Sequence, residues 1–394
     1  MSEGAMSDRA MSEGAMSEGA MGDRAMGDRA MSETVLLAIG TRKGLFLATS
    51  RDGRSSWDIT GPHHSMSGVY AVGIDARRDP VRLLAGVTSE HFGPSVATSD
   101  DLGATWQEPG RAPIAFPDGD DTALVRVWQF APGTADEPDV VYAGVEPSAL
   151  FRSTDGGVTY ELVRGLWDHP HRAEWQPGFG GMAIHTVLAH PQRTGEVLVA
   201  MSTGGVYRTT DGGTSWQASN TGIKVRFMPD PYPEFGQCVH KVARHPDRPD
   251  QFFAQNHHGV YRSDDAGVTW QSIADGLPSD FGFPMVVHPH RPGVIYNFPL
   301  VADVERFPPE GRCRVFRSED AGDTWVALEK GLPHDGFWSA VMRDAMTTDD
   351  ADPAGVYFGS RSGEVYASRD EGESWYPVVE HLPDVLCVRA AVVR

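Results

Sequence analysis

The sequence is poor in cysteine and contains no long apolar segment. Its three cysteines, Cys238, Cys313 and Cys387, are an odd number and lie far apart along 394 residues. That pattern fits a reducing compartment better than a disulfide framework. No apolar run is long enough to cross a bilayer, and no charged-then-apolar leader opens the chain. We therefore expect a soluble, cytoplasmic protein with buried thiols.

Basic residues are fewer than acidic ones, and few of them are lysines. The formal net charge is −20, and only four of the 34 basic residues are lysines. Nucleic acids and anionic membranes bind proteins through clustered basic residues, so we expect neither as a partner. The remaining basic residues are arginines, whose planar guanidinium groups suit carboxylate or phosphate ligands. A small-molecule or glycan ligand is the partner that we expect.

The first thirty residues lack aromatic and β-branched side chains. They repeat a five-residue unit six times, in the forms MSEGA, MSDRA and MGDRA. Such a segment cannot bury enough apolar surface to offset the entropy of ordering, so we predict a disordered tail over residues 1–33. Every unit opens with Met, which leaves both Met1 and Met31 as candidate starts. One folded domain is expected over residues 34–394.

A short motif, Ser/Thr-x-Asp-x-Gly-x-Ser/Thr-Trp, recurs along the folded part. Its aspartates are 49 to 56 residues apart, a period that indicates a propeller or a solenoid. The copies are Ser50 to Trp57, Ser99 to Trp106, Ser153 to Tyr160, Thr209 to Trp216, Ser263 to Trp270, Ser318 to Trp325 and Ser368 to Trp375.

Each residue type in the motif has a role in a turn. The Asp carboxylate accepts bonds from backbone N–H groups ahead of it, the Gly supplies a positive φ, and the Trp packs between sheets. Two copies depart from the pattern, with Arg54 in place of Gly and Tyr160 in place of Trp. We expect both to keep the turn. The motifs are thus predicted to be structural corners and not active sites.

These seven motifs resemble those of the BNR or Asp-box repeat proteins. That group includes sialidases, xyloglucanases, sortilin-type receptors and a photosystem II assembly factor. The resemblance covers residues 34–394 and implies a β-propeller. It says much less about activity, because sites on such folds vary between members.

Between motifs, the sequence repeats a pattern of four strands, the first of them apolar. Only two strands precede the first motif, and one apolar strand follows the last. We therefore predict an all-β fold, a seven-bladed β-propeller of four-stranded antiparallel blades, with the ring closed by the C-terminal strand joining the N-terminal blade. The predicted inner strands are Val69–Ala76, Leu124–Ala131, Ile184–His190, Val239–His245, Phe283–His288, Trp338–Asp344 and Val385–Val393.

The face opposite the motifs is where this topology places a ligand site. Its loops over Glu161–Ala183 and Gln217–Cys238 are long, and long ordered loops usually serve binding. His185 and His240 occupy equivalent positions in adjacent blades and should point toward the central channel. His257 completes a candidate cluster for one divalent metal ion, although a lone inner-strand His is more often a packing residue.

Further candidates lie on the same predicted face. The candidate catalytic residues are His185, His240, Glu146 and Tyr70, and the candidate substrate-binding residues are Arg126, Arg42, Arg361, Asn256 and Trp338. By contrast, His190, His245, His288 and His290 are predicted to be turn residues.

Three functions remain open from the sequence. The resemblance implies a sialidase-like or glycosyl-hydrolase-like enzyme of unknown substrate, with Tyr70 and Glu146 or Glu90 as the best nucleophile pair. The Phe/Tyr-Arg-Ile-Pro signature of true sialidases is missing ahead of the first motif. A metal-dependent lyase or hydrolase would use His185, His240 and His257. A non-catalytic propeller would bind a ligand or a protein.

Overall fold

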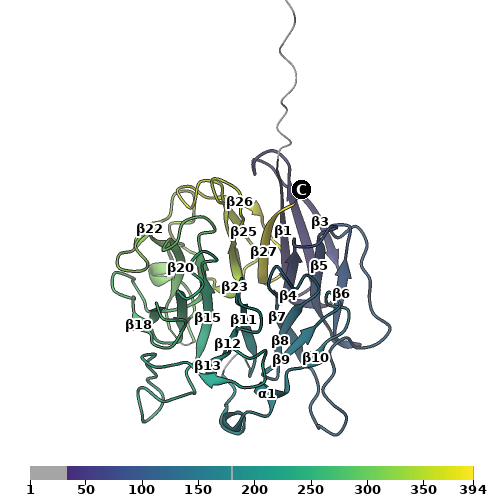
Figure 1. Cartoon of the computed structure of the whole chain (residues 1–394). Coiled ribbons are helices and arrows are strands. Elements are labelled where there is room, and N and C mark those ends of the chain that lie inside the picture. The colour runs from purple at the N-terminus through teal and green to yellow at the C-terminus, as the bar shows by residue number, and fades with distance from the viewer. Residues whose placement is uncertain (1–32, 179–180, 303, 394) are drawn as a thin grey trace, which may run out of the picture. The chain divides into compact units, whose positions relative to one another are not determined.

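The computed structural model describes residues 33–178, 181–302 and 304–393. All of the predicted N-terminal tail except Glu33 lies outside the described residues. Nearly all of the secondary structure is β-strand (Figure 1). Among the described residues, no helix is long and apolar enough to span a membrane.

Antiparallel sheets follow one another along the chain. One four-stranded sheet contains β7 (Arg126–Pro132), β8 (Val141–Glu146), β9 (Ala149–Ser153) and β10 (Glu161–Leu162), and the next contains β11 (Ile184–Ala189), β12 (Val197–Met201), β13 (Gly205–Thr209) and β14 (Gln217–Ala218). The following sheet contains β15 (Val239–Arg244), β16 (Phe252–Asn256), β17 (Val260–Ser263) and β18 (Gln271–Ser272). Another contains β19 (Phe281–Val287), β20 (Ile295–Leu300), β21 (Val315–Ser318) and β22 (Val326–Leu328).

Two further sheets complete the described strands. One contains β4 (Gly68–Asp75), β5 (Arg82–Ser89) and β6 (Gly93–Ser99). The other has the order β26-β25-β24-β23-β27-β1-β2-β3. Its strands are β1 (Thr34–Thr41), β2 (Gly44–Ser50), β3 (Asp58–His63), β23 (Val341–Thr348), β24 (Val356–Ser360), β25 (Val365–Ser368), β26 (Tyr376–Val379) and β27 (Val385–Val393).

The first and last strands of the described chain pair with each other. β27 runs antiparallel to β1 from Thr34 opposite Val393 to Thr41 opposite Val385. A single parallel bridge, Asp344 to Cys387, joins β27 to β23 and merges two four-stranded groups into one sheet. The pairing covers the free edge that a terminal strand would otherwise expose.

The first strand of each sheet packs against the first strand of the next. In space the contacts follow the order β4, β7, β11, β15, β19, β23, β27 and back to β4. Glycine on the second strand permits this close approach. A Cβ at Gly144 on β8, for example, would lie 2.4 Å from the backbone oxygen of Ile184 on β11. These strands form the apolar interior.

The repeated motif forms the predicted turn in each copy. At Asp101, one carboxylate oxygen accepts from the Thr105 amide and the Ser99 hydroxyl, and the other accepts from the Thr105 hydroxyl. The first copy keeps this arrangement although Arg54 replaces the glycine, because Arg54 itself adopts a φ of 66°. The expectation that both atypical copies still turn is confirmed.

Short helices occur only in the connections of the described chain. α1 (Arg164–Trp167) and the 3₁₀ turn Pro170–Glu174 lie in the long segment before β11, and a second 3₁₀ turn, Pro309–Gly311, precedes β21. Three of the four predicted corner histidines, His190, His245 and His288, are confirmed, since a ring nitrogen of each accepts from a following backbone amide. The fourth, His290, differs, because its Nε2 atom lies 3.1 Å from the Asp350 carbonyl oxygen and 3.0 Å from that of Ala351.

Candidate functional site

A β-bulge near the start of each inner strand shapes the site. In β15, Val239 pairs with Asn256 and Lys241 pairs with Gln255, so His240 between them has no partner in the ladder. An extra residue of this kind is released from strict alternation, and the bulge redirects its side chain. The residues inserted in the same way at the other inner strands are Tyr70, Trp128, His185, Phe283 with Pro284, Met342 through Ala345, and Leu386.

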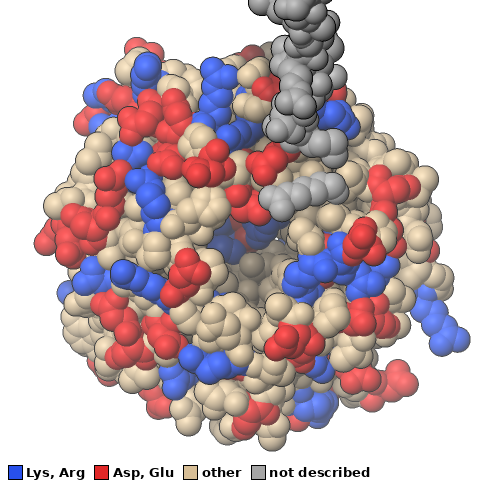
Figure 2. All heavy atoms as spheres, turned by 45° about the horizontal axis from the view of Figure 1, so that its top comes forward, with Lys and Arg blue, Asp and Glu red and all other residues tan. Residues whose placement is uncertain are grey.

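Most of these bulge residues line one central cavity of about 880 Å³. A hollow with Lys and Arg side chains within it lies near the middle of the face shown in Figure 2. Six arginines but only two carboxylates belong to the described lining of the cavity. The lining thus has a formal excess of arginine over carboxylate in a chain whose net charge is −20. The arginines are Arg42, Arg126, Arg226, Arg306, Arg343 and Arg361, and the carboxylates are Glu146 and Asp344.

Glu146 sits in a polar and aromatic corner of the cavity. Its Oε2 atom lies 3.0 Å from Arg126 Nε and accepts a 2.9 Å hydrogen bond from the indole N–H of Trp128. The Arg126 guanidinium lies over the Tyr70 ring at 4.5 Å, and Tyr70 meets Trp128 edge to face. Three of the predicted site residues, Tyr70, Arg126 and Glu146, thus meet at one place.

Arg343 and Asp344 come from the longest bulge, in β23. Arg343 is buried, and its guanidinium lies 5.1 Å from the Trp128 ring centre and 5.6 Å from that of Phe283. Burial lowers the pKa of Arg343, and the neighbouring Asp344 opposes that change.

Asp344 is held by two cations beneath the cavity. Lys241 Nζ donates to it at 2.7 Å, and Arg389 also pairs with it. Burial raises the pKa of the Asp344 carboxyl, but Lys241 and Arg389 outweigh burial and hold the pKa below its usual range. Asp344 is therefore ionised near neutral pH and does not supply a proton there.

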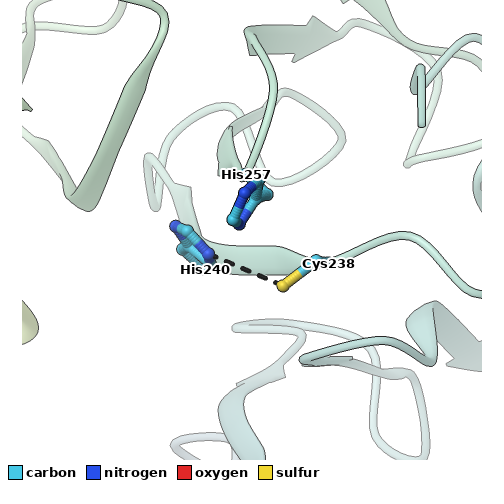
Figure 3. Close-up of side chains that lie close together, drawn as sticks. All are labelled: Cys238, His240 and His257. Atoms are coloured by element: carbon cyan, nitrogen blue, oxygen red, sulfur yellow. Dashed lines mark hydrogen bonds between the residues drawn. The ribbon is translucent and has the colours of Figure 1, made fainter. Parts of the chain in front are cut away.

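His240 and His257 both line the cavity, together with Cys238. The Nδ1 atom of His240 lies 2.6 Å from the carbonyl oxygen of Gly282, and its Nε2 atom lies 3.6 Å from Cys238 Sγ. The backbone amide of His257 donates to the carbonyl of Cys238. One candidate ligand atom from each of these three residues lies within 4.8 Å of the other two (Figure 3).

His185 occupies the bulge position of β11 but is fully buried and is not part of the cavity lining. Its Nε2 atom lies 3.4 Å from the Ser202 hydroxyl, and its Nδ1 atom 3.5 Å from that of Thr186. Burial, with the charges of Arg343 and Lys241, holds the pKa of His185 well below 6.5. The structure thus places Cys238, and not His185, beside the other two histidines.

The remaining predicted residues divide between the cavity and its surroundings. Arg42 and Arg361 line the cavity, and both pair with Asp384. Asn256 is buried, and its amide donates to the carbonyls of Lys224 and His258, so it holds two loops together.

Trp338 lies outside the described cavity lining, because it belongs to the loop before β23 and not, as predicted, to the strand. The strand starts at Val341 and not at residue 338. The Trp338 ring is 65% exposed and packs edge to face on Phe307.

Sequence reasoning missed several lining residues, and two sequence patterns could have indicated three of them. Cys238 and His240 form a Cys-x-His pair at the start of an inner strand, and Arg343-Asp344 is a charged pair inside an otherwise apolar one. Histidine, arginine and aspartate are uncommon in strands that only form a core, so both patterns indicate a site. Trp128, Arg306 and Phe283 left no comparable signal.

Known proteins resemble this chain over most of its length. No family model matches it. An oligoxyloglucan-reducing end-specific xyloglucanase of Emericella nidulans is 25% identical over 267 residues, which cover 61% of this chain and 29% of that protein. A xyloglucanase of Hypocrea jecorina is 25% identical over 292 residues, covering 66% of this chain and 32% of that protein.

A solved structure agrees with these matches. The GH74 enzyme of Niastella koreensis superposes with a TM-score of 0.62 at 17% identity, covering 90% of this chain and 53% of that one. The chain is a distant homologue of GH74 xyloglucanase Asp-box propeller domains. It spans about a third or less of the length of its curated xyloglucanase relatives.

Proposed function

We propose that this chain is a glycosidase-like propeller that binds an acidic sugar, one bearing a carboxylate, in its central cavity. Distant homology to xyloglucanases supports a carbohydrate ligand. The observation that carries the proposal is the excess of arginine in the cavity lining, six guanidinium groups against two carboxylates. Guanidinium groups bind carboxylates with strong, charge-assisted hydrogen bonds.

The architecture that we propose for this site is a seven-bladed propeller closed by β27. Two observations support it. β27 pairs with β1, and the contacts between inner strands return from β27 to β4. In such a ring, the bulges of the blades surround one channel and most of their side chains line it, which accounts for a cavity built from residues far apart in sequence.

Aromatic rings in the lining suit a sugar as well. The rings of Tyr70, Trp128 and Phe283 belong to the cavity surface, and an aromatic face packs well on the apolar C–H face of a pyranose. Arginine supplies the charge recognition and the rings supply the contact area. The volume of about 880 Å³ lies within the usual range for small-molecule sites.

Glu146 is the residue that we propose for the chemical step. Glycosidases place one group to protonate the leaving oxygen and a second to act as base or nucleophile. Asp344 does not serve as the acid, because Lys241 and Arg389 keep it ionised. Glu146 faces the cavity with one oxygen paired to Arg126, and Tyr70, whose ring lies under the same guanidinium, is the proposed nucleophile. In this scheme Glu146 accepts the phenol proton as the Tyr70 oxygen attacks the anomeric carbon, and water in the cavity protonates the leaving oxygen.

Calorimetry with matched sugars tests the proposal. Sialyllactose and a galacturonic acid oligomer are compared with lactose and a xyloglucan oligosaccharide, at low and high salt. We expect the acidic ligands to bind more tightly and their affinity to fall with salt. Equal affinity for neutral and acidic sugars, or no binding of either, would contradict the proposed ligand class.

Hydrolysis is measured separately on aryl glycosides of the sugars that bind. Turnover that is lost in Glu146→Gln, with binding retained, supports the enzymatic part of the proposal. Acidic-sugar binding without turnover on any of these glycosides would instead favour the non-catalytic binding protein. The concave cavity supports a small ligand over a broad protein surface in either case.

A further inference from the structure

Cys238, His240 and His257 form a cluster of side chains with the donor set of a transition-metal site. One ligand atom from each lies within 4.8 Å of the other two, and the Sγ and Nε2 atoms of the first two are 3.6 Å apart. Zinc bonds of about 2.3 Å to sulfur and 2.0–2.1 Å to nitrogen at tetrahedral angles place these atoms roughly 3.5 Å apart. The pair already has the spacing that a shared zinc ion requires.

Backbone geometry sets this spacing in advance. Cys238 directly precedes β15, and the bulge at residues 239–241 carries His240 to the same side. His257, just after β16, is fixed by the 2.8 Å hydrogen bond from its amide to the Cys238 carbonyl. Figure 3 shows the three side chains lying close together, with the contact between His240 and Cys238 dashed. A site on paired strands needs little reorganisation to bind a metal.

The nitrogen of His240 that faces away from Cys238 makes the hydrogen bond that metal-binding histidines usually make. Its Nδ1–H donates to the Gly282 carbonyl at 2.6 Å, which leaves the Nε2 lone pair facing Cys238. A backbone carbonyl on the far nitrogen orients the ring and raises its basicity as a ligand. A Cβ at residue 282 would lie 2.8 Å from the Phe298 carbonyl oxygen, so glycine allows this strand to come close.

The cluster opens onto the cavity, since all three residues line it. Three protein ligands with an open fourth position are typical of catalytic zinc, whereas structural zinc has four. Arg343 and Arg306 in the same lining repel a bare dication. The Cys238 thiolate offsets one charge, and an anionic fourth ligand offsets the rest. The arginines therefore favour a metal that holds a carboxylate or hydroxide.

A second group of candidate ligands, His190, Glu196 and Asp250, does not have these properties. Arg193 donates to both of its carboxylates, so a cation already occupies the position between them. Its two carboxylates belong to an ion-pair network with Arg193.

We propose that Cys238, His240 and His257 bind one Zn²⁺ ion, with its fourth coordination position open to the cavity. Binding converts the Cys238 thiol to a zinc thiolate and releases its proton to solvent. The proposal does not depend on the identity of the sugar ligand. A carboxylate in the cavity would bind the metal and the arginines together.

The first experiment measures metal binding by the reduced full-length chain. Co²⁺ replaces Zn²⁺ as a probe, because a thiolate–Co²⁺ bond gives an intense near-ultraviolet charge-transfer band. We expect one equivalent to bind, the band to appear, and Zn²⁺ to remove it. Cys238→Ser abolishes the band, and His257→Ala weakens binding at least tenfold. His258→Ala and Cys313→Ser are matched controls that retain it. No Co²⁺ binding by the wild-type chain, or an unchanged band in Cys238→Ser, overturns the proposal.

A second experiment uses only the wild-type chain, so it does not depend on whether the variants fold. Iodoacetamide alkylation of Cys238 in the wild-type chain is followed by mass spectrometry, with and without Zn²⁺. Zinc should slow the reaction at least tenfold, and EDTA should restore the rate. A rate that zinc does not change identifies an ordinary thiol and refutes the site.

Discussion

Arg54 forms a buried ion pair with Asp349, 295 residues further along the chain. The Nη1 atom of Arg54 lies 3.2 Å from the Asp349 carboxylate, and its Nη2 atom donates to the Pro353 carbonyl. Arg54 stands where the other motif copies have glycine, and it keeps the positive φ of that position. The departure from the motif thus ties the first repeat to the segment that joins β23 and β24.

Replacing Arg54 with glycine restores the motif and removes the ion pair. Breaking a buried pair costs about 3–5 kcal/mol of unfolding free energy, and relief of the left-handed arginine backbone returns about 1 kcal/mol. The Tyr357 hydroxyl and two amides still bind Asp349, so we expect a net loss of about 2 kcal/mol. Equilibrium urea unfolding measures it.

Arg51→Ala is the control for that experiment. Arg51 pairs with Asp58 on the surface, where both side chains are mostly exposed. Exposed pairs contribute under about 1 kcal/mol, so this variant should unfold near the wild-type midpoint. Equal losses in the two variants would contradict a specific role for Arg54.

The motif aspartates predict a loss of stability in acid. Hydrogen bonds from the Thr105 hydroxyl and amide and from Ser99 lower the pKa of Asp101 to about 2, whereas an unfolded Asp titrates near 3.9. A lowered pKa contributes stability that is present above about pH 4 and is lost as the pH falls through 2. The melting temperature of Asp101→Asn should therefore fall less between pH 5 and pH 2 than that of wild type. Parallel curves would count against this account.

Arg343 should control the affinity for an acidic ligand. It is buried in the cavity wall against Trp128 and Phe283, so Arg343→Met keeps much of the packing and removes the charge. A hydrogen bond to a charged group contributes about 1.5–3 kcal/mol, which corresponds to roughly tenfold or more in the dissociation constant. Calorimetry should show that loss for carboxylated sugars and little change for neutral ones.

Replacing Trp338, in contrast to Arg343, should not change the affinity for a cavity ligand. The ring is largely exposed and packs on Phe307, outside the described cavity lining. Trp338→Ala should leave the affinity for any cavity ligand within about twofold, because its contacts lie elsewhere. A tenfold loss on the same calorimetric assay would show that the site extends beyond the cavity.

The strands were predictable because their residues repeat. Val385–Val393 was predicted with the bounds that β27 has, and most other inner strands lie within two residues of their predicted starts. The error at β23 came from Trp338, which belongs to the preceding loop and not to the strand. Turn chemistry was equally readable, since each motif specifies its own hydrogen bonds.

The site was only partly predictable, because bulges break the alternation on which the sequence argument rests. His185 and His240 occupy equivalent positions, yet only His240 reaches the cavity. Cys238 was interpreted as a buried thiol, because nothing in the sequence shows that His257 is bonded to its carbonyl. Side-chain direction at a bulge depends on neighbouring blades.

Most strand residues both pair their backbone with the neighbouring strand and present a side chain, whereas the unpaired residues at the bulges only present a side chain. Tyr70, Trp128 and His240 contribute little to the backbone ladder beside them, which closes on either side. Each can change its chemistry while its sheet keeps its hydrogen bonds. Libraries of cavity variants could therefore be made at these positions, one sheet at a time, while the backbone hydrogen bonds of the sheets are kept.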